Sequence, residues 1–231
     1  MKNILFVSLM ALSLSTFANT LDNNCPSFSL RKYPIVSHQV KVEYVCHKKY
    51  ALAYDDVNKI TIYVATKVNP SMMSGKIIRG NNFRVDGSMS PDYAVKPSDY
   101  VGTPYDKGHL AEAELFTTDN EAMDESFLMS NMHPQVANFN RGIWKSLETY
   151  THNLAKNDTI YIISGTVYGS KSNHIGRGVT VPEYSWKVIQ IPSFQTVEAY
   201  LIPNVEHKND TFKKYKVTVK EIEIATGLHF N

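Results

Sequence analysis

The sequence lacks an excess of charge of either sign. Its 231 residues carry 24 lysines and arginines against 22 aspartates and glutamates, for a formal net charge of +2 and a sequence pI of about 8.3. Bulk charge therefore gives no argument for nucleic-acid binding, and any basic footprint has to be local. The chain also lacks internal repeats, low-complexity tracts and breaks in composition. These absences favour one α+β domain over residues 19–231.

Long apolar runs are scarce as well. Residues 4–14 form an apolar run that is short for a membrane span. Lys2 precedes this run and the small residues Thr16 and Ala18 follow it, which is the pattern of a secretory signal peptide. We predict a signal peptide over residues 1–18, a periplasmic or secreted mature protein, and no stable membrane association after cleavage. A retained anchor helix is the alternative.

Cysteine is rare, with Cys25 and Cys46 as the two copies. In an exported protein an even number of cysteines indicates a disulfide. Closing a loop of about 20 residues should stabilise the fold by about 3 kcal/mol in the chain-entropy model. A redox or metal-binding pair is the alternative, but the spacing fits no metal motif.

Hydrophobic periodicity predicts a central antiparallel sheet with flanking helices. Apolar alternation and β-branched runs predict strands over residues 40–44, 50–54, 60–68, 159–164, 184–192 and 197–203, and residues 212–219 also alternate. Helical spacing and capping signals predict helices over residues 118–128, 139–156 and 219–225. Residues 19–35 are predicted to be an irregular arm and residues 130–138 a loop broken by Pro134.

Residues 69–104 are rich in proline, glycine, serine and asparagine. A loop this long within a compact domain is usually functional or disordered, and this one leads directly to a histidine motif. We predict a functional surface loop to which Arg79, Arg84 and Lys96 lend local positive charge. The alternative is a solvated loop with scattered charges.

His109 is the candidate general base. An imidazole titrates near pH 6.5, so it can take a proton from water at neutral pH. Gly108 lets the backbone approach closely, and Lys107 can hold a phosphate oxygen as a point charge. A lone histidine is more often a core or surface residue whose hydrogen bonds are satisfied than a catalytic group, and this is the alternative for His109.

Asn140 and Glu148 are the candidate metal-site residues. The amide oxygen of Asn140 could ligate Mg²⁺, a hard cation that keeps several waters. A neutral ligand leaves the full charge of the ion facing a phosphate. Glu148 follows eight residues later, about 80° around an α-helix, and could orient a metal-bound water. The alternatives are a helix cap for Asn140 and a solvated helix charge for Glu148.

Five segments in order resemble the DNA/RNA non-specific endonuclease family of ββα-metal nucleases. They are YDKGHL, SNMHPQVANFNRGIWKSLE, ISGTVY, VPEYSWKVI and IEIATGL, and the match runs from about residue 83 to residue 228. The resemblance implies that a β-ribbon carrying the histidine lies against the helix that carries the metal-binding asparagine. It also implies a Mg²⁺ cofactor, with Mn²⁺ as a substitute, and DNA and RNA as substrates.

The resemblance also implies roles for single residues. His109 matches the histidine that activates water, and Asn140 the asparagine that binds Mg²⁺. Asn131 matches an asparagine that supports the active site, and Glu148 the glutamate near the metal waters. Arg141 falls in the same helix motif, where it could contact phosphate.

One position departs from the family pattern. Lys107 stands where the family usually has arginine, so the positive charge is kept but the bidentate fork is lost. Asp106 is interpreted as a structural residue that orders the turn before His109, and His133 as a loop residue. Trp144 is predicted to pack in the core.

We therefore predict an exported, Mg²⁺-dependent endonuclease that cleaves DNA and RNA to 5′-phosphorylated products. One alternative is an inactive nucleic-acid-binding module, which the lysine at position 107 and the near-neutral charge favour. The other is a metal-dependent phosphodiesterase that acts on small substrates. The oligomeric state is not predicted.

Overall fold

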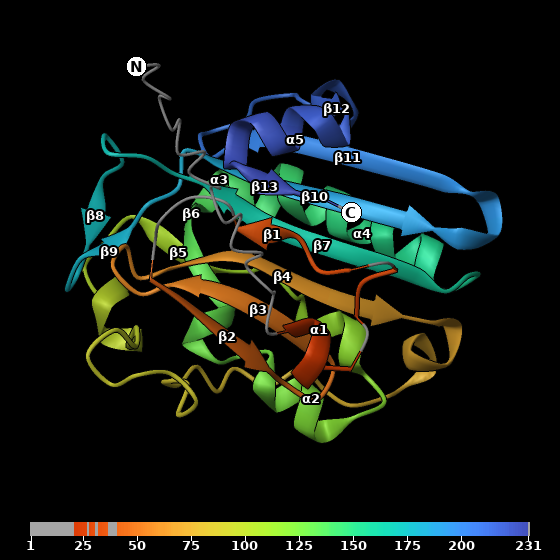
Figure 1. Cartoon of the computed structure of the whole chain (residues 1–231), viewed down its shortest axis with the longest axis horizontal. Coiled ribbons are helices and arrows are strands. Elements are labelled where there is room, and N and C mark those ends of the chain that lie inside the picture. The colour runs from red at the N-terminus through yellow and green to blue at the C-terminus, as the bar shows by residue number, and fades with distance from the viewer. Residues whose placement is uncertain (1–20, 27, 31, 37–40, 231) are drawn as a thin grey trace, which may run out of the picture.

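The computed structural model describes residues 21–26, 28–30, 32–36 and 41–230 (Figure 1). The predicted signal peptide lies outside these residues. A seven-stranded sheet crosses the molecule in the order β12-β11-β10-β7-β4-β3-β2, and every neighbouring pair in it is antiparallel. This arrangement confirms the predicted α+β class.

The sheet is built from β2 (Val42–Cys46), β3 (Tyr50–Asp55), β4 (Ile60–Val68), β7 (Ile160–Val167), β10 (Tyr184–Ile191), β11 (Thr196–Pro203) and β12 (Lys216–Val217). Three two-stranded ribbons stand apart from it: β1 (Ile35–Val36) with β13 (Leu228–His229), β5 (Tyr105–His109) with β6 (Met132–Val136), and β8 (His174–Ile175) with β9 (Val179–Thr180). The helices are α1 (Leu21–Asn24), α2 (Asn120–Glu125), α3 (Ala137–Phe139), α4 (Lys145–Ala155) and α5 (Val219–Thr226).

The hairpin between β3 and β4 shows how local chemistry sets the sheet. The Asp55 carboxylate accepts hydrogen bonds from the backbone amides of Val57 and Asn58, both at 3.0 Å, and so closes the turn between the two strands. The β-branched run that follows is almost entirely buried as β4. The predicted strand over residues 60–68 is confirmed to the residue.

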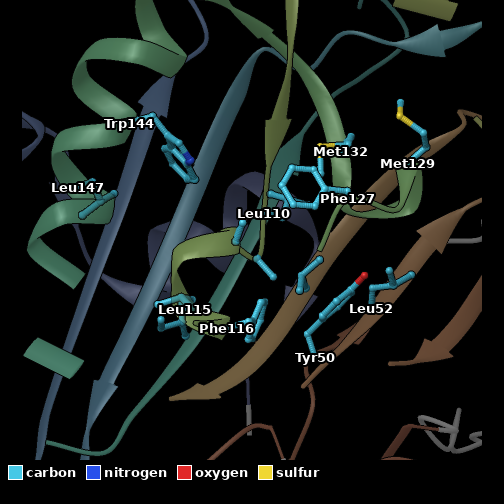
Figure 2. Close-up of a cluster of buried hydrophobic side chains, with 14 of the residues drawn as sticks. Tyr50, Leu52, Leu110, Leu115, Phe116, Phe127, Met129, Met132, Trp144 and Leu147 are labelled. Carbon is cyan, nitrogen blue, oxygen red and sulfur yellow. The ribbon is translucent and has the colours of Figure 1, made fainter. Parts of the chain in front are cut away.

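Each face of the sheet carries its own hydrophobic cluster. The larger cluster lies under α4 and the ribbon β5–β6, and Figure 2 shows Trp144 and Leu147 pointing from their helix toward the strands. Both side chains are fully buried, which confirms the predicted packing of Trp144. The smaller cluster joins the opposite face to Leu21, Ile222 and Leu228 of α1, α5 and β13. The site described below stands over the larger cluster.

The prediction for residues 130–138 is wrong. Residues Met132–Val136 form β6, which pairs with β5 in a register that sets Pro134 opposite Lys107. Proline is accepted because β6 pairs with β5 alone, so no second ladder needs the missing amide. His133, predicted to lie in a loop, is instead fully buried, and its Nε2 lies 2.9 Å from the Ser185 hydroxyl.

Three smaller expectations also change. The alternating residues 212–219 form a 3₁₀ turn, Phe212–Tyr215, followed by only two strand residues. The predicted irregular arm contains the short α1 and β1. The helix predicted over residues 118–128 is shorter, because the Asp119 side chain caps it and it ends at Glu125.

Cys25 and Cys46 form the predicted disulfide, with their Cα atoms 5.6 Å apart. The bond ties the N-terminal arm to the end of β2, at the edge of the sheet. Across the described part of the chain, no helix combines the length and apolarity that a bilayer span requires.

Candidate active site

The ribbon β5–β6 brings two distant motifs together. Gly108 pairs with His133 and His109 with Met132, so the first motif lies along the second. A β-carbon on Gly108 would collide with the Gln135 side chain, which explains why glycine is needed at this crossing.

Asn131 is buried beneath the ribbon. Its side chain accepts from the Ala111 amide and donates to the Ala111 carbonyl, both at 2.8 Å, and also donates to the carbonyl of Ser126. These bonds fix the chain two residues beyond His109. The geometry is that of a supporting residue, and Asn131 is not among the residues that line the cleft described below.

His109 sits at the end of β5, only 7% exposed, with its ring against Phe83 and Phe127. Burial, with a contribution from the positive charge of Arg79, lowers the pKa of His109 to about 3. The imidazole is therefore neutral in the resting cleft. The ring lines the cleft described below, and its Nε2 is buried with no hydrogen-bond partner among the described residues.

Asn140 and Arg141 are both held by Asp106. The Asp106 carboxylate accepts from Asn140 Nδ2 at 3.0 Å and from Arg141 Nε and Nη2 at 2.8 and 2.6 Å. Burial pushes the pKa of Asp106 up, but these hydrogen bonds hold it below its ordinary value. Asp106 was interpreted as ordering the turn before His109, whereas its carboxylate joins β5 to the start of the helix.

The helix itself departs from prediction at the site. Residues Asn140–Trp144 form a π-helical turn between α3 and α4. Because a π turn is wider, each residue rotates by less than in an α-helix, so the offset between Asn140 and Glu148 falls below the expected 80° or so. Both residues line one cleft as a result.

This cleft has a volume of about 330 Å³. Six of the residues singled out from the sequence line it: Arg79, Lys107, His109, Asn140, Arg141 and Glu148. Lys96 and Arg84 do not. The Arg84 guanidinium instead meets the Asp124 carboxylate at 2.7 Å and the Asp124 carbonyl at 2.7 Å, and its nucleic-acid role stays a prediction.

No carboxylate forms an ion pair with Lys107 in the part of the chain that the structure describes. Its ammonium lies 5.0 Å from the ring centre of Phe83 and 5.7 Å from that of Tyr100. Cation–π contacts orient the lysine while leaving its N–H donors free for an anion. Two aromatic faces therefore guide the ammonium where the family usually has a fork-shaped guanidinium.

A buried charge cluster beside the cleft has no signal in the sequence. Glu112 is 2% exposed. Its carboxylate lies 3.2 Å from His152 Nε2 and 3.8 Å from Lys187 Nζ. Lys187 is on β10 and is fully buried. Burial raises the pKa of Glu112, but Lys187 and His152 bring it below its ordinary value. Glu148 is half-buried nearby, and burial together with Glu112 raises its pKa well above the ordinary value.

The donor set of the cleft fits a hard divalent cation. The amide nitrogen of Asn140 is engaged by Asp106, which leaves its carbonyl oxygen as the free end. The Glu148 carboxylate adds a second oxygen donor in the same cleft. No group of three or more histidine, cysteine or acidic side chains that could hold a metal occurs in the described ranges.

A β-ribbon bearing a histidine, packed beside a helix bearing an amide ligand, is the arrangement of a ββα-metal nuclease. The model of the DNA/RNA non-specific endonuclease family matches residues 32–231, and the chain belongs to that family. It is 34% identical to a nuclease of Nostoc sp. over 195 residues, which are 79% of this chain and 70% of that protein. It is 27% identical to human mitochondrial endonuclease G over 200 residues, which are 79% of this chain and 67% of that protein.

A solved structure agrees with these relatives. The crystal structure of an EndoG/EndoGI complex contains a chain that is 29% identical, with a TM-score of 0.76 over 81% of this chain and 84% of that chain. The protein is therefore an endonuclease of a metal-dependent family, as the five sequence segments predicted.

Proposed function

We propose that this endonuclease hydrolyses DNA and RNA with Mg²⁺, for which Mn²⁺ can substitute, and leaves 5′-phosphorylated ends. The observation that carries the proposal is that His109 and Asn140, 31 positions apart in the sequence, line the same cleft beside the cations of Lys107 and Arg79. A base, an amide oxygen and positive charge around one space suit attack of water on a phosphodiester.

His109 acts as the base in this proposal. Its neutral ring lines the cleft, where it can take a proton from water. Entry of an anionic phosphate raises the proton affinity of the imidazole, because a nearby negative charge favours the protonated form. The ring stays oriented during this transfer because Phe83 and Phe127 pack against it.

Lys107 and Arg79 bind the non-bridging phosphate oxygens. The Arg79 guanidinium lies over the Phe127 ring at 5.5 Å, and its Nε is 3.7 Å from the Glu114 carboxylate, so it is placed but not neutralised by a close pair. Asn140 and Glu148 are the residues that would hold the metal, Asn140 directly and Glu148 through water. When bound, Mg²⁺ supplies charge stabilisation for the phosphoryl group and the leaving oxygen.

We further propose that the mature protein is exported to the periplasm or the medium. The apolar run near the N-terminus and the Cys25–Cys46 disulfide support this location, because disulfides persist in oxidising compartments. Recognition through phosphate and sugar carries little sequence information, which suits an enzyme that cleaves many sequences.

The test is cleavage of plasmid DNA and of RNA by the mature protein, with Mg²⁺, with Mn²⁺ and with EDTA. Wild-type protein should cleave both polymers in either metal and neither in EDTA, and end-labelling should find 5′-phosphates. His109→Ala and Asn140→Ala should each lose at least 100-fold in rate, the scale of a lost general base. Wild-type rate in either variant would remove that residue from the mechanism, and binding without cleavage in both metals would sink the proposal as a whole.

A further inference from the structure

The cations along the helix side of the cleft are not equivalent. Arg141 and Lys145 are one helical turn apart, both line the cleft, and both are exposed. Arg141 is bound in a bidentate pair by Asp106, at 2.8 and 2.6 Å, so its charge is largely neutralised. Lys145 has no carboxylate within ion-pair distance among the described residues.

The positions of these residues on the helix order them along the cleft. Asn140, the proposed metal ligand, stands at the start of the π turn, and Lys145 begins α4 five residues later. A chain rises about 1.5 Å per helical residue, so Lys145 stands several ångströms beyond the proposed scissile position. Phosphates recur along a nucleic-acid strand, and the next one falls on a neighbouring part of the protein surface.

We propose that Lys145 binds a second phosphate of the substrate strand, next to the phosphate that is cleaved, and so favours polynucleotides over single phosphodiesters. This inference rests on the proposed function and adds a subsite to it. Lys145 then replaces Arg141, which the sequence motif had suggested, as the phosphate contact of this helix.

A lysine suits such a subsite. Its ammonium is a flexible point charge that follows a backbone without requiring one fixed geometry. Glu112 and Glu114, which lie outside this helix, also line the cleft, so an approaching phosphate is repelled there and attracted toward Lys145. Because each phosphate contact releases condensed counterions, the contact of Lys145 should make the binding constant for nucleic acid depend more steeply on salt concentration.

The experiment compares Lys145→Gln with Lys156→Gln, which removes the same charge from the end of the same helix outside the cleft. Binding to a fluorescent oligonucleotide is measured in EDTA, where the proposed reaction does not run, across a salt series. Lys145→Gln should reduce the slope of log K against log salt by about 0.7 for a single strand and about 0.9 for a duplex. Lys156→Gln should leave the slope unchanged, and Lys145→Arg should restore it.

A second measurement separates this subsite from the chemistry. On a polynucleotide with Mg²⁺, Lys145→Gln should raise KM about tenfold with little change in kcat, while kcat/KM on bis(4-nitrophenyl) phosphate, which has a single phosphodiester, should stay at the wild-type value. An unchanged salt slope in Lys145→Gln would overturn the proposal, and so would an equal loss on both substrates. Failure of wild-type protein to cleave any substrate would instead reject the proposed function.

Discussion

The carboxylate of Asp106 accepts a hydrogen bond from the side-chain amide of Asn140, at 3.0 Å, and thereby decides which end of that amide is free. An asparagine that is not held can present either its NH₂ group or its oxygen to a cation, and only the oxygen is a ligand. Asp106 is therefore a positioning residue for the proposed metal site, on the strand that also carries His109.

Replacing Asp106 by asparagine removes one of the two acceptor oxygens, so the Asn140 amide and the Arg141 guanidinium must compete for the oxygen that is left. We expect a loss of 10–100-fold in apparent Mg²⁺ affinity or in activity, the usual cost of removing a group that orients a metal ligand. The measurement is initial cleavage rate as a function of Mg²⁺ concentration. We expect the fold to survive this substitution, which circular dichroism can confirm.

Asp124→Asn is the matched control for this experiment. Asp124 also pairs with an arginine, Arg84, at 2.7 Å, but neither residue lines the cleft. Its Mg²⁺ dependence should equal that of the wild type. Equal Mg²⁺ dependence in Asp106→Asn and in the wild type would show that Asn140 needs no such support.

Arg79 and Arg84, the two arginines of residues 69–104, should differ in how much each contributes to cleavage. Arg79→Ala should lower kcat/KM on DNA and RNA by about 10–100-fold, because a charge-assisted contact worth roughly 1.5–3 kcal/mol is lost at the phosphate. Arg84→Ala should leave kcat/KM near the wild-type value, since its guanidinium is held by Asp124. A steady-state series on one labelled duplex decides the matter, and a larger loss in Arg84→Ala than in Arg79→Ala would reverse the assignment.

Much of this fold could be predicted because local patterns and tertiary packing agree. The β-branched run that becomes β4 and the apolar stripe of α4 each specify their element without help from distant residues. The ribbon strand β6 was missed for the opposite reason. Pro134 is a breaking signal in isolation, and only pairing with β5 on a single side makes a strand acceptable there.

The features of the site can be divided in the same way, into those that the local sequence marks and those that only the fold creates. His109, Asn140 and Glu148 could be singled out because a motif marks each of them, and all three line the cleft. The π turn that aligns Asn140 with Glu148 has no sequence signature, and neither has the pairing of Glu112 with Lys187, which are 75 positions apart. Buried ion pairs arise from the fold as a whole, so a single sequence does not reveal them.

The disulfide should contribute stability without taking part in catalysis. Cys25 and Cys46 are 21 positions apart, and removing a closure of that length should lower the free energy of unfolding by about 3 kcal/mol. We expect this decrease in urea denaturation of the Cys25→Ala/Cys46→Ala double variant. Its cleavage rate per folded molecule should match the wild type, because neither cysteine lines the cleft. A large loss of rate in fully folded variant would contradict this separation.

Two of the buried histidines, His109 and His133, should make the fold sensitive to acid. Burial lowers the pKa of His133 to about 3, from an ordinary value of 6.5, and the pKa of His109 falls to about 3 as well. Between these values the unfolded chain holds protons that the folded protein lacks. Unfolding then takes up protons, so the stability present above pH 6.5 is lost as the pH falls toward 3, at about 1.4 kcal/mol per pH unit for each histidine.

The His133→Asn variant tests this linkage through a slope rather than through absolute stability. Losing the contact with Ser185 will itself cost stability at every pH, but the dependence of unfolding free energy on pH should become shallower by one proton. Urea titrations at about pH 5 and pH 7 measure that slope. His174→Asn, at an exposed histidine, should leave it unchanged. Parallel curves for His133→Asn and the wild type would mean that His133 titrates alike in the folded and unfolded states, and that burial does not exclude its proton.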